Sequence, residues 1–111
     1  DDKQGYLRVR YCCQARAIEN QVYIATTGTV GNLAVEGLEV HYGQASILTP
    51  SDFAFARDGI AAEGTPNVEQ IIVADVDIGN LRESRINGSV TPLYDKRPDI
   101  YSRPAEVVKV P

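Results

Sequence analysis

The sequence has 111 residues, of which 43% are hydrophobic and 23% charged, a composition that fits one globular domain and excludes collagen-like, coiled-coil and disordered chains. Eleven basic and fifteen acidic residues give a net charge of −4 with no clustered basic face, so neither nucleic acid nor a membrane surface is an expected partner. No apolar run approaches the roughly 18 residues of a membrane span, and no signal peptide is visible.

Two residue counts bear on the origin of the chain. There is no methionine, so we expect a processed, truncated or proteolysed piece of a longer polypeptide. Cys12 and Cys13 are adjacent, and a disulfide between neighbours would be strained. We therefore expect reduced thiols in a reducing compartment, the cytoplasm.

The first half of the chain predicts a helix and two strands. A helix is expected from Gly5 to about Gln21, because apolar residues recur there on one helical face. Those residues are Leu7, Tyr11, Ala15, Ile18 and Val22. A β-branched stretch predicts a strand over Val22–Val30, and a second strand is expected over Gln44–Thr49, ended by Pro50.

The second half predicts a strand, a helix and a tail. Residues 53–67 favour turns, with a short extended piece around Gly59–Glu63. The apolar run Glu69–Val76 is typical of a strand covered on both faces. Asp77 is a candidate cap for a helix over Ile78–Ile86, and the rest is expected to be loop-like, with an extended tail over residues 102–111.

These elements indicate an α/β protein built in layers. A sheet with two apolar faces needs a helical layer on one side and a second apolar layer on the other. A chain of this size does not readily supply both layers, which predicts that part of the fold comes from elsewhere.

The reactive side chains do not form a complete catalytic set. Cys12 and Cys13 fall in the middle of the predicted helix, where the helix dipole does not activate a thiol, so we interpret them as packing residues. His41 is the one histidine and is expected on a surface or pocket rim, although a thiol enzyme using Cys13 and His41 remains an alternative.

Other candidate sites carry less chemistry. Glu36, Glu39 and Glu63 are possible acids or bases, but nothing distinguishes them from solvated carboxylates. The glycines of the stretch 28–32 follow a strand without opening a helix, so a dinucleotide or phosphate loop is not indicated. No metal site is expected, because a site needs more ligands at fixed spacing.

Five motifs, in order along the chain, resemble those of the nitrilase superfamily, the carbon–nitrogen hydrolases. The family's A-R-A-x-E-N helix and following strand resemble Gln14–Ile24. The other four lie at Gly28–Gly31, at Tyr42–Pro50, at Ile71–Asp77 with Leu81 and Arg85, and at Arg97–Tyr101. Thr49–Phe55 resembles a subgroup that is sometimes fused to an acetyltransferase-like domain.

Two positions depart from the family pattern. Ser89 stands where the family often has proline, and the family's G-x-S is shifted by one residue in Gly43–Ser46. Both departures fall near loops, where substrate preference is set.

The resemblance implies a partial four-layer α-β-β-α sandwich, with residues 1–111 as its C-terminal part. The family's glutamate, lysine and cysteine would all lie upstream, so no catalytic residue is carried over to this chain. Gly31, His41, Tyr42 and Gln44 are expected at the pocket rim. The structural motif residues are Arg16, Glu19, Asn20, Asp77 and Arg85.

The resemblance also implies partners. The full-length protein would hydrolyse a small amide or nitrile without a metal or organic cofactor, and it would self-associate through the N-terminal helix and the C-terminal tail. The alternative is a non-catalytic interaction or adaptor module that reuses this piece of a fold.

Overall fold

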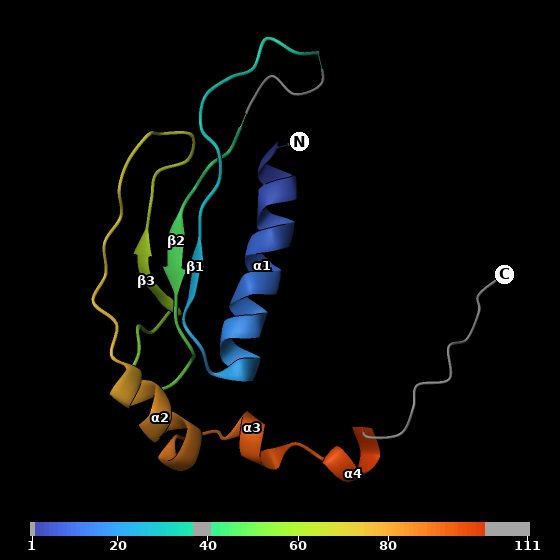
Figure 1. Ribbon diagram of the computed structural model, residues 1–111, viewed down its shortest axis with the longest axis vertical. Coiled ribbons are helices and arrows are strands. Elements are labelled where there is room, and N and C mark those ends of the chain that lie inside the picture. Colours follow the sequence, from blue (N-terminus) through green and yellow to red (C-terminus); the bar gives the residue numbers. More distant parts are fainter. Residues whose placement is uncertain (1, 37–40, 102–111) are drawn as a thin grey trace, which may run out of the picture.

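The computed structural model describes residues 2–36 and 41–101, so the expected tail over 102–111 and Glu39 lie outside the described residues. The elements are α1 (Asp2–Asn20), β1 (Ile24–Thr26), β2 (Ser46–Leu48), β3 (Ile60–Glu63), α2 (Ile78–Asn87), α3 (Pro92–Asp95) and α4 (Pro98–Tyr101). The three strands form one antiparallel sheet in the order β1-β2-β3, and α1 packs along it (Figure 1).

The end of α1 is set by a left-handed residue. Gln21 has a φ of 47°, its amide donates to the carbonyl of Ile18, and the amide of Val22 donates to that of Ala17. This is the pair of hydrogen bonds of a Schellman motif, in which glycine usually takes the left-handed position. The predicted helix end is therefore confirmed, with glutamine in a conformation that costs free energy unless its surroundings hold it.

The surroundings of Gln21 come from the second helix. Arg85 donates from Nε and Nη2 to the carbonyl oxygen of Gln21, at 3.1 and 2.9 Å. The amide nitrogen of the Gln21 side chain donates in turn to both oxygens of Ser84 and to the carbonyl of Val90. Gln21 is buried, so this network joins α1, the approach to β1 and α2 in a site where water does not compete.

The face of α1 that meets the sheet is not the predicted apolar face. Arg10, Ala17 and Gln21 are buried there, whereas Tyr11 is 63% and Ile18 is 42% exposed. The apolar residues do share a face, but that face is turned away from the sheet, so Tyr11 and Ile18 are exposed. Sequence periodicity finds the face and does not show what covers it.

The strands are shorter than predicted, and one lies elsewhere. Only Ile24–Thr26 of the first predicted strand pairs with β2. The predicted strand over Glu69–Val76 is wrong: within the described residues it forms no strand, and Ile71 is 92% exposed. The third strand is β3, from the short extended piece, because that segment pairs with β2.

The helix after this segment forms as predicted. Asp77 accepts hydrogen bonds from the amides of Gly79 and Asn80, which caps the first turn of α2. Tyr23 fixes this cap, because its hydroxyl lies within hydrogen-bond distance of both the amide and the carbonyl of Asp77. The chain beyond α2, predicted as loop, contains the single-turn helices α3 and α4, and each begins with a proline, whose fixed φ favours a first helical turn.

Removing the Arg85 side chain tests the junction at Gln21. We expect Arg85→Ala to lower the free energy of unfolding by about 2 kcal/mol, because a buried carbonyl loses two charge-assisted hydrogen bonds. Urea unfolding followed by circular dichroism measures the change. Arg82→Ala is the matched control, since Arg82 is exposed on the same helix, and an equal loss in both variants would contradict the role given to Arg85.

Candidate functional site

The four expected rim residues meet at one end of the sheet. The amide of His41 donates to the carbonyl of Gly31 at 3.3 Å, and the amide of Gly31 donates to Oδ1 of Asn67 at 2.7 Å. The amide of Asn67 donates to the carbonyl of Tyr42, and the side chain of Gln44 donates to the carbonyl of Gly64 at 2.9 Å. The structure thus joins the two arms of the β1–β2 connection to each other and to the segment that follows β3.

Glycine at position 43 allows a close approach of two backbone segments. Gly43 has a φ of 42°, and a Cβ built on it would lie 2.2 Å from the carbonyl oxygen of Thr29. A Cβ on Gly28 would lie 3.4 Å from the Cα of Gly43. A side chain at position 43 would push the backbone segments apart, whereas 3.4 Å at Gly28 is an ordinary van der Waals distance, so glycine is a geometric requirement at position 43.

The side chain of His41 contacts a neighbouring hydroxyl. Nδ1 of His41 and Oγ1 of Thr29 lie 3.0 Å apart, which is a hydrogen bond whose direction depends on the histidine tautomer. Of the two cysteines, Cys12 is exposed and Cys13 is half-buried on α1. Among the described residues, no group of three or more His, Cys, Asp or Glu side chains could hold a metal ion.

A small cavity lies beside these loops, against α1. Its volume is about 90 Å³, and its walls come from α1, the end of β1 and the loop before β2. The lining residues are Tyr6, Val9, Arg10, Thr26, Thr27, Gly28, Gly43 and Gln44. Gln44 is therefore the one expected rim residue that lines this cavity.

Tyr6 and Arg10, which line this cavity, form a network with Glu63 that sequence analysis missed as a group. Nη1 of Arg10 donates to the hydroxyl of Tyr6 at 2.7 Å, and Nη2 pairs with a carboxylate oxygen of Glu63 at 2.8 Å. Arg10 is only 5% exposed. The spacing of four residues between Tyr6 and Arg10 was a local signal for their contact, but the pairing with Glu63 depends on how α1 packs on the sheet.

Tyr6 is held both by its hydrogen bond with Arg10 and by an aromatic contact. Its ring packs against that of Tyr42, with centroids 4.6 Å apart. Burial raises the pKa of Tyr6 above its ordinary value, against a smaller lowering by the Arg10 cation. The phenol consequently stays protonated at neutral pH and can donate a hydrogen bond.

The expected motif residues have structural roles. Arg16 and Glu19 form an exposed ion pair on α1, and the side chain of Asn20 donates to the carbonyl of Arg16. Asp77 caps α2, and Arg85 holds the carbonyl of Gln21. All five stabilise helix ends or the junction between the helices.

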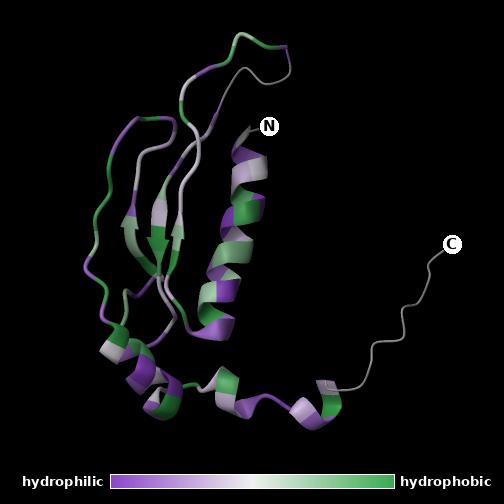
Figure 2. Cartoon of the chain, in the orientation of Figure 1, coloured by the Kyte–Doolittle hydropathy of each residue, from purple (hydrophilic) through white to green (hydrophobic). Residues whose placement is uncertain are grey.

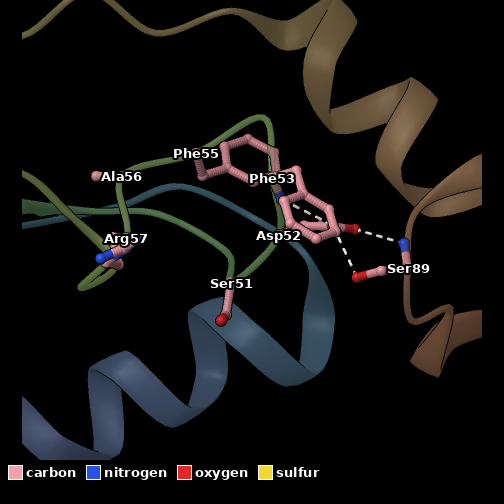
Figure 3. Close-up of a pocket in the computed structure, with 7 residues that line it drawn as sticks. All are labelled: Ser51, Asp52, Phe53, Phe55, Ala56, Arg57 and Ser89. Carbon is pink, nitrogen blue, oxygen red and sulfur yellow. Dashed lines mark hydrogen bonds between the residues drawn. The ribbon is translucent and has the colours of Figure 1, made fainter.

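A second hollow, of about 440 Å³, lies at the turn between β2 and β3 (Figure 3). Asp52 accepts hydrogen bonds there from the amides of Phe53 and Ser89 and from the hydroxyl of Ser89. The bond from the Phe53 amide, followed by that from the Ser89 hydroxyl, lowers the pKa of Asp52. Proline at position 89 would supply neither of the donors that Ser89 offers, so this departure from the family pattern has a structural use.

Comparisons with known proteins relate the chain to part of a longer one. It is 56% identical over 102 residues to a Bacillus subtilis (strain 168) protein named "Probable hydrolase YhcX". The match covers 91% of this chain and 20% of that protein, so the chain spans about a fifth of the length of this relative. No protein-family model matches the chain. No solved structure matches it either.

Over residues 2–36 and 41–101, no helix is both long and apolar enough to cross a membrane.

Proposed function

We propose that these 111 residues are the C-terminal part of a carbon–nitrogen hydrolase of the nitrilase superfamily, whose glutamate, lysine and cysteine lie elsewhere in a longer polypeptide. The observation that carries the proposal is the 56% identity to one fifth of a protein named as a probable hydrolase. The ordered motifs from Gln14 to Tyr101 support the finer assignment to this superfamily. The relative is about five times as long as the match, which leaves room for the rest of a hydrolase domain and for a further domain.

The distribution of apolar side chains supports a part that is completed by other residues. Among the described residues, the buried hydrophobic side chains are Ala17, Leu48 and Leu81. Figure 2 shows several hydrophobic residues along the segment between β3 and α2. In this segment the side chains of Ile71 and Val73 are 92% and 81% exposed. Apolar surface of this kind marks an interface. In the proposed four-layer α-β-β-α sandwich, the remaining layers would cover it.

The proposed chemistry is acyl transfer to a thiol. A cysteine thiolate attacks the carbonyl carbon of a small amide, and the protonated nitrogen leaves as an amine or as ammonia, which gives a thioester. With a nitrile the attack first gives a thioimidate, and a water molecule adds to it before ammonia leaves, which gives the same thioester. Water then hydrolyses the thioester, which returns the thiol. In this proposal the lysine stabilises the oxyanion, the glutamate moves protons, and no metal or organic cofactor takes part.

The contribution of this chain is the sheet, α1 and the rim. The loops that carry Gly31, His41, Tyr42 and Gln44 are held together at one end of the sheet by backbone and side-chain hydrogen bonds. Loops that are hydrogen-bonded in this way are suited to shape the entrance of a pocket formed with other residues. The second candidate, a non-catalytic interaction or adaptor module, rests on the same exposed apolar positions and predicts no turnover.

Replacing both cysteines tests the hydrolase proposal. We expect the polypeptide as its gene encodes it to release ammonia from a panel of small amides and nitriles, and to form an acyl adduct seen by intact mass. The variant carrying Cys12→Ser and Cys13→Ser should keep its turnover within about twofold, because both thiols are placed outside the catalytic set.

Two results would contradict this account. Loss of turnover in the double variant would favour the thiol enzyme that uses Cys13 and His41. Absence of ammonia release and of an adduct across the panel would favour the adaptor module.

We propose in addition that the protein forms homo-oligomers through α1 and the tail over residues 102–111. The apolar face of α1 is turned away from the sheet, and Tyr11 on it is 63% exposed. A hollow of about 440 Å³ lies beside this face, lined by Lys3, Gln4, Leu7, Arg8 and Tyr11. A second copy of the helix offers the same apolar surface, as a two-fold interface requires.

A charge on this face tests the assembly. We expect Tyr11→Asp, combined with removal of residues 102–111, to shift the polypeptide to a smaller species in sedimentation velocity, because a carboxylate would be buried at the interface. Tyr94→Asp, on an exposed tyrosine of α3, is the matched control. An unchanged sedimentation coefficient in the combined variant would rule this interface out.

A further inference from the structure

The buried arginine at the small cavity has an unused donor. Arg10 is 95% buried, and its two terminal nitrogens are engaged by Tyr6 and Glu63. Its Nε is buried and has no hydrogen-bond partner among the described residues. A buried donor without an acceptor costs free energy, and native structures rarely leave one unsatisfied. An acceptor from outside the described residues is therefore needed.

A second donor lies at the same cavity. The oxygen of Tyr6 accepts a hydrogen bond from Arg10, so the hydroxyl proton of Tyr6 has to point elsewhere. Of the hydrogen bonds described for the chain, none takes this proton. Burial keeps the phenol protonated by raising its pKa, so the donor persists at neutral pH. Tyr6 and Arg10 both line the cavity.

The size and charge of the cavity limit what it can hold. About 90 Å³ is several times the roughly 10–15 Å³ that one water needs, so there is space for one small polyatomic group. Solvent screens the negative charge of Glu63, which is 37% exposed, but not the positive charge of the buried Arg10. The cavity therefore suits an acceptor with one negative charge, while the second charge of a phosphate dianion would have no partner.

We propose that this cavity binds one carboxylate group, which accepts hydrogen bonds from Nε of Arg10 and from the hydroxyl of Tyr6. The two oxygens of a carboxylate match two donors, and guanidinium–carboxylate pairs are among the strong hydrogen bonds of proteins. The carboxylate belongs either to a free small acid or to an Asp or Glu side chain elsewhere in the same polypeptide. The proposal does not depend on hydrolase activity.

The test observes the Arg10 side chain directly. The polypeptide as its gene encodes it is labelled with ¹⁵N-arginine, and the Nε–H signals are followed by NMR during titration with sodium acetate. Sodium chloride at equal ionic strength is the reference. Arg10→Lys identifies the Arg10 signal by its loss and keeps the positive charge, and Arg8→Lys on the exposed side of the same helix controls for the substitution.

Binding of a free acid predicts a saturable shift of the Arg10 signal with acetate and none with chloride. The dissociation constant should be on the order of 1 mM, as expected for a ligand of four heavy atoms. Tyr6→Phe should weaken this affinity about tenfold by removing one donor. Tyr11→Phe, an exposed tyrosine on the same helix, should leave it unchanged.

The second source predicts a different result. If the carboxylate is a side chain of the polypeptide itself, acetate has no effect, and the Arg10 Nε proton shows a nuclear Overhauser contact to the methylene protons of an Asp or Glu other than Glu63. The proposal is overturned if acetate acts no differently from chloride and no such contact is found. Neither readout uses turnover, so a failed hydrolase assay does not affect the result.

Discussion

The described structure depends on one buried left-handed residue, Gln21. Its backbone ends α1, its carbonyl oxygen accepts two hydrogen bonds from Arg85, and its side chain donates to Ser84 and Val90. A non-glycine residue in this conformation is strained, and the surrounding hydrogen bonds compensate for that strain. Because these partners come from α2 and the segment after it, the direction of α1 and the position of α2 are fixed together.

This junction explains why a polar face of α1 lies against the sheet. With the helix end fixed, Arg10 is directed to Glu63 on β3, and Tyr6 to Tyr42 in the loop before β2. The loop before β2 is then joined to α1 through the packing of Tyr6 on Tyr42, and β3 is joined to α1 through the ion pair of Arg10 with Glu63. The same geometry turns the apolar residues around Tyr11 away from the sheet, so they are exposed and available to contact a partner.

Local chemistry could be predicted from the sequence, and long-range pairing could not. The cap at Asp77 and the end of α1 depend on residues within one turn, and both predictions are confirmed. The strand predicted over Glu69–Val76 depends on a pairing partner that the described residues do not supply, so apolar content alone gave a wrong assignment.

The same distinction holds for the site. Gly31, His41, Tyr42 and Gln44 could be selected through the family resemblance, and they do lie together. The network of Arg10 with Tyr6 and Glu63 could not be found in this way. It joins a helix to a strand more than fifty residues away, and an arginine in the middle of a helix is usually solvated.

The central claim is that these residues complete their core against other parts of a longer polypeptide. Hydrogen exchange of the backbone amides of Ile71, Ile72 and Val73 tests it most directly, when the 111-residue chain is compared with the polypeptide as its gene encodes it. The account predicts exchange at least about a hundredfold slower in the encoded polypeptide, because a covering layer would exclude water from the segment there. Equally fast exchange in both would contradict it.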